Sequence, residues 1–396
     1  MGESAVSVSS KRPNVRLIGL LGLGHMVVDM YQGALPALLP SLRVAHSLSY
    51  AAVGTLVLVT SITSSVIQPI FGYLVDRRAT SWMLPVSVFL AGLGLSLVGI
   101  APTYSMVVGL LVVMGIGVAS FHPLAYKTAA SVAGEKRATA ISWFSVGGNA
   151  GNSFGPPVVA SLLAIYGLRG SLGMLPAALL MAALMSLVLP RLSSSQVRIE
   201  KHAAGCPAPR TMYGAVALLI LIVALRSWAQ LGFMTFLPFY YVDYLSADQH
   251  SVGIALFVFL GGGVLGTLVG GPLADRWGAR RFMQWGFLVA APLGVLFLLS
   301  RGAVALLVLG LFGGVLISTF TITVVLGQSY LPGNTGLAAG LIVGFAIGTG
   351  GVAVTLLGWI ADHFGLLIVL WIAAIMPLAC FLAAIYLPVP REESHS

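Results

Sequence analysis

Five ionisable side chains interrupt long hydrophobic stretches of this 396-residue chain: His25, Asp29, His122, Lys127 and Arg226. A charge at the centre of a bilayer costs about 2.5–3.5 kcal/mol, so it persists only where it faces water, a partner or a ligand. Carboxylate and imidazole groups can exchange protons, and a guanidinium offers a planar fork of donors for phosphate, phosphonate or carboxylate. These residue types therefore indicate a polar pathway inside a membrane, where protons and an anion bind.

The elements that must position these residues are transmembrane helices. The chain is 58% hydrophobic and only 8% charged, whereas a soluble domain carries about 25% charged residues. Its apolar runs are long enough for helices of about 20 residues, which cross a hydrocarbon core of ~30 Å. We predict an all-α membrane protein, since a barrel would need short alternating strands. The twelve predicted spans are 17–40, 50–73, 82–101, 104–131, 138–165, 170–190, 212–240, 251–273, 282–300, 303–331, 335–361 and 366–388.

The basic residues fix the predicted orientation. Of the 20 Lys and Arg residues, fifteen fall on one side of the predicted membrane, three on the other, and Lys127 and Arg226 within it. Because cytoplasmic loops carry the excess of Lys and Arg, both termini are predicted to be cytoplasmic. The net charge of +9 is then a topology signal and not a nucleic-acid-binding patch. Cys206 and Cys380 support neither a disulfide framework nor a metal site.

An internal repeat divides the chain. Gly72-Tyr-Leu-Val-Asp76-Arg77 resembles Gly271-Pro-Leu-Ala-Asp275-Arg276, 199 residues further on. Two parallel six-helix bundles with a site between them near the midplane are expected from such a repeat. The predicted parts are a cytoplasmic segment 1–16, bundles 17–190 and 212–388, a cytoplasmic linker 191–211 and a cytoplasmic tail 389–396.

Two glycine patterns have physical readings. Gly147, Gly151 and Gly155 recur every four residues before Pro156, so one helix face is bare backbone that a neighbouring helix can approach closely. In contrast, Gly261-Gly-Gly263-Val-Leu-Gly266 fits a dinucleotide fingerprint but lies inside an apolar span. That fingerprint needs a preceding strand, so we do not interpret it as a nucleotide site.

The first and fourth predicted spans hold the candidate proton carriers. His25, Asp29 and Gln32 are spaced i, i+4 and i+7, so they share a helix face. We predict that Asp29, with His25 or His122, exchanges protons. The alternatives are a carboxylate satisfied by a helix–helix hydrogen bond and a histidine with a structural role. Pro123, next to His122, is expected to kink its helix.

The candidate substrate-binding residues are those expected to surround a bound anion. Arg226 lies near the centre of the seventh span, too deep to reach the membrane surface easily, and Gln230 shares its face. Lys127 is near the cytoplasmic end of its span, so snorkelling to the surface is the alternative interpretation. The predicted substrate-binding set is Arg226, Lys127, His122, Gln32, Gln230 and Tyr126.

Taken together, these motifs resemble the fosmidomycin-resistance branch of the major facilitator superfamily over almost the whole chain. The segments that carry the resemblance are His25-Met-Val-Val-Asp29-Met-Tyr-Gln32, Phe121-His-Pro123, Val146-Gly-Gly-Asn-Ala-Gly151, Gly155-Pro156, Gly344-Phe-Ala-Ile-Gly-Thr-Gly-Gly351 and Gly358-Trp-Ile-Ala-Asp-His363.

The resemblance implies the major facilitator fold and a bacterial inner-membrane exporter driven by proton exchange, whose namesake substrate is an anionic phosphonate. It implies that the Gly/Pro pattern Gly147, Gly151, Gly155 and Pro156 is an antiporter motif. It also implies a cytoplasmic latch made of Gly72, Asp76, Arg77, Gly271, Asp275 and Arg276; simple loop charge for topology is the alternative.

We therefore expect a proton-coupled antiporter that exports a small anionic compound by alternating access, as a monomer in the inner membrane. No cofactor, metal or nucleic acid is expected, and the proton gradient supplies the energy. An uptake symporter or uniporter for a small anion or sugar-like metabolite is the first alternative. A polytopic membrane enzyme or sensor is the second, although the sequence shows no catalytic constellation.

Overall fold

The computed structural model describes residues 14–77, 81–132, 137–194, 212–331, 342 and 347–389, and every regular element in these ranges is a helix. The elements of the first half are α1 (Val15–His46), α2 (Tyr50–Ser61), η1 (Ile62–Val66), α3 (Gln68–Arg77), α4 (Met83–Leu97), η2 (Val98–Ile100), α5 (Tyr104–Ser131), α6 (Arg137–Tyr166), η3 (Gly167–Met174) and α7 (Leu175–Ser194). Those of the second half are α8 (Tyr213–Phe239), η4 (Tyr240–Tyr244), α9 (Gln249–Trp277), α10 (Ala279–Leu299), α11 (Gly302–Tyr330), α13 (Ile347–Phe364) and α14 (Leu366–Ile385).

Hydropathy and length suit these helices to a bilayer. Within the described ranges, nine helical stretches are long and apolar enough to cross a membrane, and one of them joins α6 to α7. The helix α1 is not among the nine, because the polar residues His25, Asp29 and Gln32 lower its hydropathy. A helix nevertheless lies over each of the twelve predicted spans as far as the description reaches, so the prediction of an all-helical membrane protein is confirmed.

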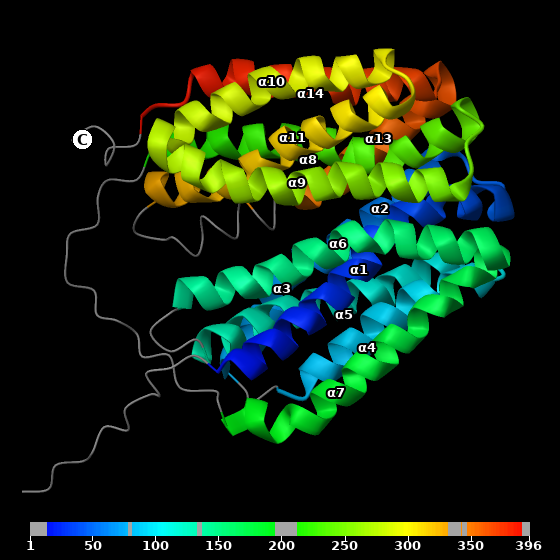
Figure 1. Ribbon diagram of the computed structural model, residues 1–396, viewed down its shortest axis with the longest axis vertical. Coiled ribbons are helices and arrows are strands. Elements are labelled where there is room, and N and C mark those ends of the chain that lie inside the picture. The colour runs from blue at the N-terminus through cyan, green and yellow to red at the C-terminus, as the bar shows by residue number, and fades with distance from the viewer. Residues whose placement is uncertain are drawn as a thin grey trace, which may run out of the picture.

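The helices form two groups, α1–α7 and α8–α14, which lie one above the other in Figure 1. In the first group α1 and α6 pack backbone against backbone. A Cβ on Gly147 would meet the carbonyl of Gly22, and one on Gly151 would meet the carbonyl of Met26. The close approach that the glycine spacing of α6 predicted is therefore present, and α1 is the neighbour.

The most extensive packing between the groups is that of α2 on α13 and of α6 on α9. Small residues again allow the approach, since a Cβ on Gly54 of α2 would lie 2.7 Å from the carbonyl oxygen of Val354. On α9, a Cβ on Gly253 would lie 2.8 Å from the Cβ of Ala160. The helix α6 thus contacts both halves of the molecule.

Polar contacts between the halves gather at one end, where α1 ends and α2 begins. The Asp243 carboxylate accepts from Arg43 Nη1 at 2.9 Å and from the Tyr50 hydroxyl at 2.7 Å. The Asp362 carboxylate accepts from the backbone N–H groups of Tyr50 at 2.7 Å and Ala51 at 2.9 Å. There it meets the positive end of the α2 dipole. In the described part of the chain, all hydrogen bonds between the halves lie at this end, which we call the bonded end.

Candidate functional site

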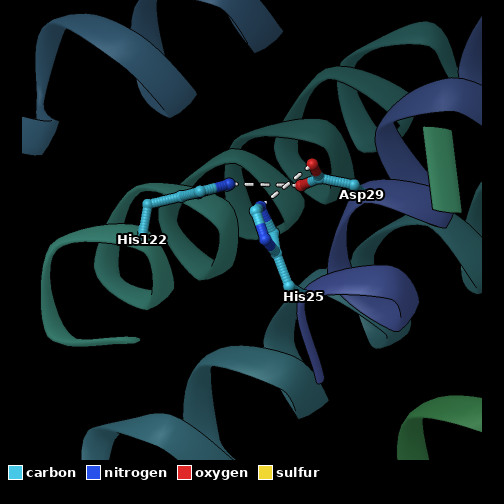
Figure 2. A group of neighbouring side chains, drawn as sticks. All are labelled: His25, Asp29 and His122. Carbon is cyan, nitrogen blue, oxygen red and sulfur yellow. Dashed lines mark ion pairs between the residues drawn. The ribbon is translucent and has the colours of Figure 1, made fainter. Parts of the chain in front are cut away.

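Asp29 forms ion pairs with two histidines of its own half, as Figure 2 shows. His25 Nε2 lies 3.2 Å from Oδ2 of Asp29, and His122 Nε2 lies 3.2 Å from Oδ1. His25 stands one turn before Asp29 on α1, whereas His122 comes from α5. At most 17% of any of these side chains is exposed. We call His25, Asp29 and His122 the Asp29 cluster.

The other ring nitrogens fix the orientation of both imidazoles. His25 Nδ1 lies 2.9 Å from the carbonyl oxygen of Phe144, and His122 Nδ1 lies 2.9 Å from that of Val118. A carbonyl oxygen only accepts, so each Nδ1 carries the proton and donates. Each imidazole therefore turns its Nε2 toward the Asp29 carboxylate, and each contact is an ion pair when that Nε2 carries a proton. The cluster thus has places for two protons beside the carboxylate.

Packing holds the cluster in place. The His25 ring stacks on the Phe144 ring with centroids 4.2 Å apart. A Cβ on Gly148 would contact His25 Nε2 and would lie 2.7 Å from Asp29 Oδ2. The glycine on α6 therefore makes room for the ion pair between two residues of α1.

Two imidazoles and a carboxylate are also a donor set that suits a transition-metal ion such as Zn²⁺. The three ligating atoms of the Asp29 cluster lie within 4.8 Å of one another. Sequence reasoning grouped these three residues for proton exchange and identified no metal-ligand cluster. Protons on the two Nε2 atoms account for the contacts without a metal ion.

Arg226 of α8 occupies a second polar site, in the other half. It is 2% exposed, and its Nε donates to Thr319 Oγ1 at 3.1 Å and to the Leu316 carbonyl at 3.3 Å. Its Nη2 donates to Gln230 Oε1 at 2.7 Å, and its guanidinium carbon lies 5.1 Å from the centroid of the Phe320 ring. Within the described ranges no carboxylate lies at ion-pair distance from Arg226. Neutral acceptors hold the guanidinium, so its positive charge is not cancelled by a described acidic group.

A cavity of about 180 Å³ opens beside this guanidinium, between α6, α8, α9 and α11. Asn149, Asn152 and Ser153 line it from the first half, and Arg226 and Gln230 line it from the second. Sequence reasoning missed the two asparagines. Their spacing of i, i+3 inside an apolar span places them on one helix face, and this pattern could have identified them.

The structure thus separates two charged groups that the sequence analysis assigned to one polar pathway. Asp29 pairs with histidines of the first half, whereas Arg226 bonds residues of the second half, and Asp29 is not in the wall of the Arg226 cavity. The helix α6 is common to both sites, because Gly148 packs on the Asp29 cluster and Asn149 lines the cavity.

The remaining predicted site residues are distributed around these two centres. Gln32 is 3.5 Å from Ser64, a weak contact, and its side chain is not in the wall of the Arg226 cavity. The Tyr126 hydroxyl lies 3.4 Å from the Ser145 hydroxyl, and its ring is 6.0 Å from that of His25, at the edge of the Asp29 cluster. Lys127 is half-buried on α5, and the cavity wall does not include it.

The predicted latch falls at helix C-termini, since α3 ends at Arg77 and α9 ends at Trp277. The side chains of Asp76, Arg77 and Asp275 lie outside the described residues, so the latch stays a prediction. Arg276 is exposed on α9, and a Cβ on Gly271 would meet no atom within 4 Å.

The fold and these sites define a class of membrane transporter, and comparisons with known proteins place the chain in it. A family model described as Major Facilitator Superfamily matches residues 21–244 and 216–396. The chain belongs to the major facilitator superfamily; it is a transporter and not an enzyme.

Individual relatives extend over nearly the full chain. It is 30% identical to the fosmidomycin resistance protein of Escherichia coli K12 over 396 residues, with 98% of this chain and 97% of the relative covered. It is 33% identical to the uncharacterized MFS-type transporter YfnC of Bacillus subtilis 168 over 371 residues, covering 92% and 91%. The crystal structure of the nucleoside transporter NupG has a similar fold, with a TM-score of 0.74, 14% identity and coverage of 94% and 99%. The resemblance that the sequence motifs indicated is therefore confirmed, both to the superfamily and to the fosmidomycin resistance protein.

Proposed function

We propose that this chain is a proton-coupled antiporter of a bacterial inner membrane that exports a small anionic compound by alternating access. In this proposal bundles 17–190 and 212–388 rock about the site between them. The segments 1–16, 191–211 and 389–396 are cytoplasmic, and the protein works as a monomer without a cofactor or resident metal. The proton gradient drives transport.

The uncancelled charge of Arg226 carries the proposal. A buried guanidinium that bonds only neutral groups among the described residues can accept an anion without first breaking an ion pair. Its planar fork suits the oxygens of a phosphonate, phosphate or carboxylate. The amides of Gln230, Asn149 and Asn152 in the same cavity wall supply further donors. Lys127, His122, Gln32 and Tyr126, which lie outside that wall, would meet the ligand only in another conformation.

The Asp29 cluster is the proposed proton site. Its two Nε2 protons give a net charge of +1 with the carboxylate ionised, and loss of one proton makes the cluster neutral. Antiport requires that protons and ligand bind in alternation. The helix α6 contacts both sites, so its movement would make the fully protonated cluster and the occupied cavity mutually exclusive. This competition between proton and ligand couples the two fluxes.

The direction of transport rests on the Gly/Pro pattern of α6, Gly147, Gly151, Gly155 and Pro156, and on likeness to a fosmidomycin resistance protein. With both termini cytoplasmic, the bonded end is extracytoplasmic, and its hydrogen bonds hold the two halves together on that side. In the opposite conformation the residues Gly72, Asp76, Arg77, Gly271, Asp275 and Arg276 would latch the cytoplasmic ends.

Accumulation of a phosphonate in cells tests this proposal. Cells that express the chain are expected to accumulate less fosmidomycin than cells that carry an empty vector, and Arg226→Ala should restore accumulation. Arg281→Ala, at an exposed position on α10, is the matched control and should export normally. Increased accumulation would instead show uptake, as expected of a symporter or uniporter. Equal accumulation with wild type and Arg226→Ala, at equal membrane expression, would rule out the proposed role of the guanidinium.

A further inference from the structure

A second, larger cavity adjoins the one beside Arg226. It has a volume of about 860 Å³ and is lined by residues of α9 and α11, with α6 and α10 at its sides. Its wall is formed almost entirely by apolar residues and glycines, and among the described residues that line it only Ser153 and Ser318 carry a hydroxyl group. We call this cavity the apolar groove.

Glycines hollow the groove. A Cβ on Gly262 would meet the backbone of Gly310, and a Cβ on Gly266 would meet that of Gly314, so α9 and α11 cross in close contact. Gly261, beside them, has no atom within 4 Å of an added Cβ and faces open space. The glycine run that does not serve as a nucleotide motif therefore forms the floor of a groove.

The groove opens on the outside of the helix bundle. Leu265 is 66% exposed and Trp285 is 58% exposed, although both are large apolar side chains in the wall. In a membrane protein such a surface faces acyl chains and not water. An apolar chain could therefore reach the groove from the bilayer.

The two cavities share a wall. Ser153 of α6 and Val264 of α9 line both the apolar groove and the Arg226 cavity. Ser318, at the edge of the groove, directly precedes Thr319, which accepts from Arg226 Nε. A buried cation thus lies next to an apolar space that is open to lipid.

We propose that the transported anion is amphiphilic: its acidic head binds at Arg226, and its apolar chain lies in the groove, which it reaches sideways from the membrane. This proposal rests on the anion site proposed above and adds a ligand class to it. A cavity of 180 Å³ holds a head of roughly ten heavy atoms, at the density of packed interiors. The chain of a longer ligand needs the adjoining space.

A series of alkylphosphonates tests the proposal on the purified full-length chain in nanodiscs of zwitterionic lipid. Binding of methylphosphonate and octylphosphonate would be measured against wild type, Gly261→Leu and Gly109→Leu. Leucine at position 261 fills the groove without a backbone clash; the control Gly109, on α5, also has no atom within 4 Å of an added Cβ but does not line the groove.

In wild type and Gly109→Leu, octylphosphonate should bind at least about 30-fold more tightly than methylphosphonate, since each buried methylene contributes about fourfold and only part of the chain needs burial. In Gly261→Leu this ratio should fall to the ratio at which the two phosphonates partition into nanodiscs without protein. The affinity for methylphosphonate should be unchanged. Partitioning into the nanodisc is the same for every variant, so the change in ratio reports the groove alone.

The outcomes separate the two proposals. Failure of methylphosphonate to bind wild type would contradict the anion site itself. Methylphosphonate could bind normally while octylphosphonate gains as much affinity in Gly261→Leu as in wild type. That result would overturn the proposal of an amphiphilic ligand, and the groove would then be a surface for bilayer lipid. Should Gly261→Leu misfold, octylphosphonate brominated at its terminal carbon provides a second measurement. It should quench the fluorescence of Trp277 and Trp285, which line the groove, more in wild type than in W277F/W285F; equal fractional quenching would count against the proposal.

Discussion

The two polar sites of this protein solve the problem of burying charge in opposite ways. The Asp29 cluster pairs a carboxylate with two histidines, so the charge of the carboxylate is offset within one half, and the net charge of the cluster changes when a proton leaves. The Arg226 site holds a permanent cation with the neutral oxygens of Leu316, Thr319 and Gln230. The first arrangement is suited to titration, and the second is suited to binding an anion from outside the protein.

The difference also shows why coupling requires a connection between the sites. They belong to different halves, and α6 is the element that contacts both. A rearrangement of α6 that relaxes the space at Gly148 would move Asn149 in the cavity wall. Coupling by shared position on one helix is more specific than coupling by long-range charge, which is weakened by water in an open cavity.

Replacement of the Asp29 carboxylate should have the largest effect on transport, and it should separate the roles of the two sites. Asp29→Asn removes the charge that both histidines face, so transport driven by a pH gradient should fall to the level of protein-free liposomes. Exchange of ligand across the membrane without a gradient should persist, because the Arg226 site is intact. Uptake and counterflow in proteoliposomes measure the two activities. Asp248→Asn, at an exposed helix N-cap, is the control; gradient-driven transport by Asp29→Asn would refute the assignment.

Crowding of the cluster should have the next largest effect. In Gly148→Ala the added methyl meets His25 and Asp29, and such overpacking costs ~1–3 kcal/mol. Transport should lose its dependence on the pH gradient, whereas ligand affinity at fixed pH should change by less than about threefold, because the guanidinium is not touched. Gly109→Ala has open space for its methyl and serves as the control. A purely structural role of Gly148 would instead lower both activities together.

The bonded end offers a way to test whether movement of the halves connects the sites. Asp362→Ala removes the acceptor of two N–H groups at the start of α2, which should cost about 0.5–2 kcal/mol. A cysteine at Ser41, in a background without native cysteines, should then react about 2–30-fold faster with a maleimide. Asp248→Ala removes a cap within one half and should leave the rate unchanged. An unchanged rate in Asp362→Ala would show that this contact does not hold the end closed.

The smallest effect is expected in the wall of the anion cavity. Asn149→Ala deletes one amide, so ligand binding should weaken by about 2–10-fold, in line with ~0.5–1.5 kcal/mol for a hydrogen bond. The dependence of transport on the pH gradient should persist, which distinguishes this variant from Gly148→Ala one residue earlier. Calorimetric titration with a phosphonate measures the affinity. Loss of gradient dependence in Asn149→Ala would mean that the two faces of α6 do not act separately.

Much of the fold was predictable because the bilayer demands it. A backbone in hydrocarbon must satisfy its own hydrogen bonds, so long apolar runs become helices whatever their neighbours are. The pairing of α1 with α6 was only partly predictable. Gly147 and Gly151 predicted a close helix contact but did not identify the helix that makes it. His25 and Asp29 were predicted as neighbours from their spacing on one helix, a local relation.

The sequence by itself determined the helices, the residues that can carry charge in a membrane and the superfamily. Only the tertiary structure decided that His122 joins Asp29, that Arg226 lies in a different site, and that Asn149 and Asn152 face that site. The physical reason is that spacing along one helix is set by local geometry, whereas contacts between helices depend on how glycines and large side chains let whole helices approach.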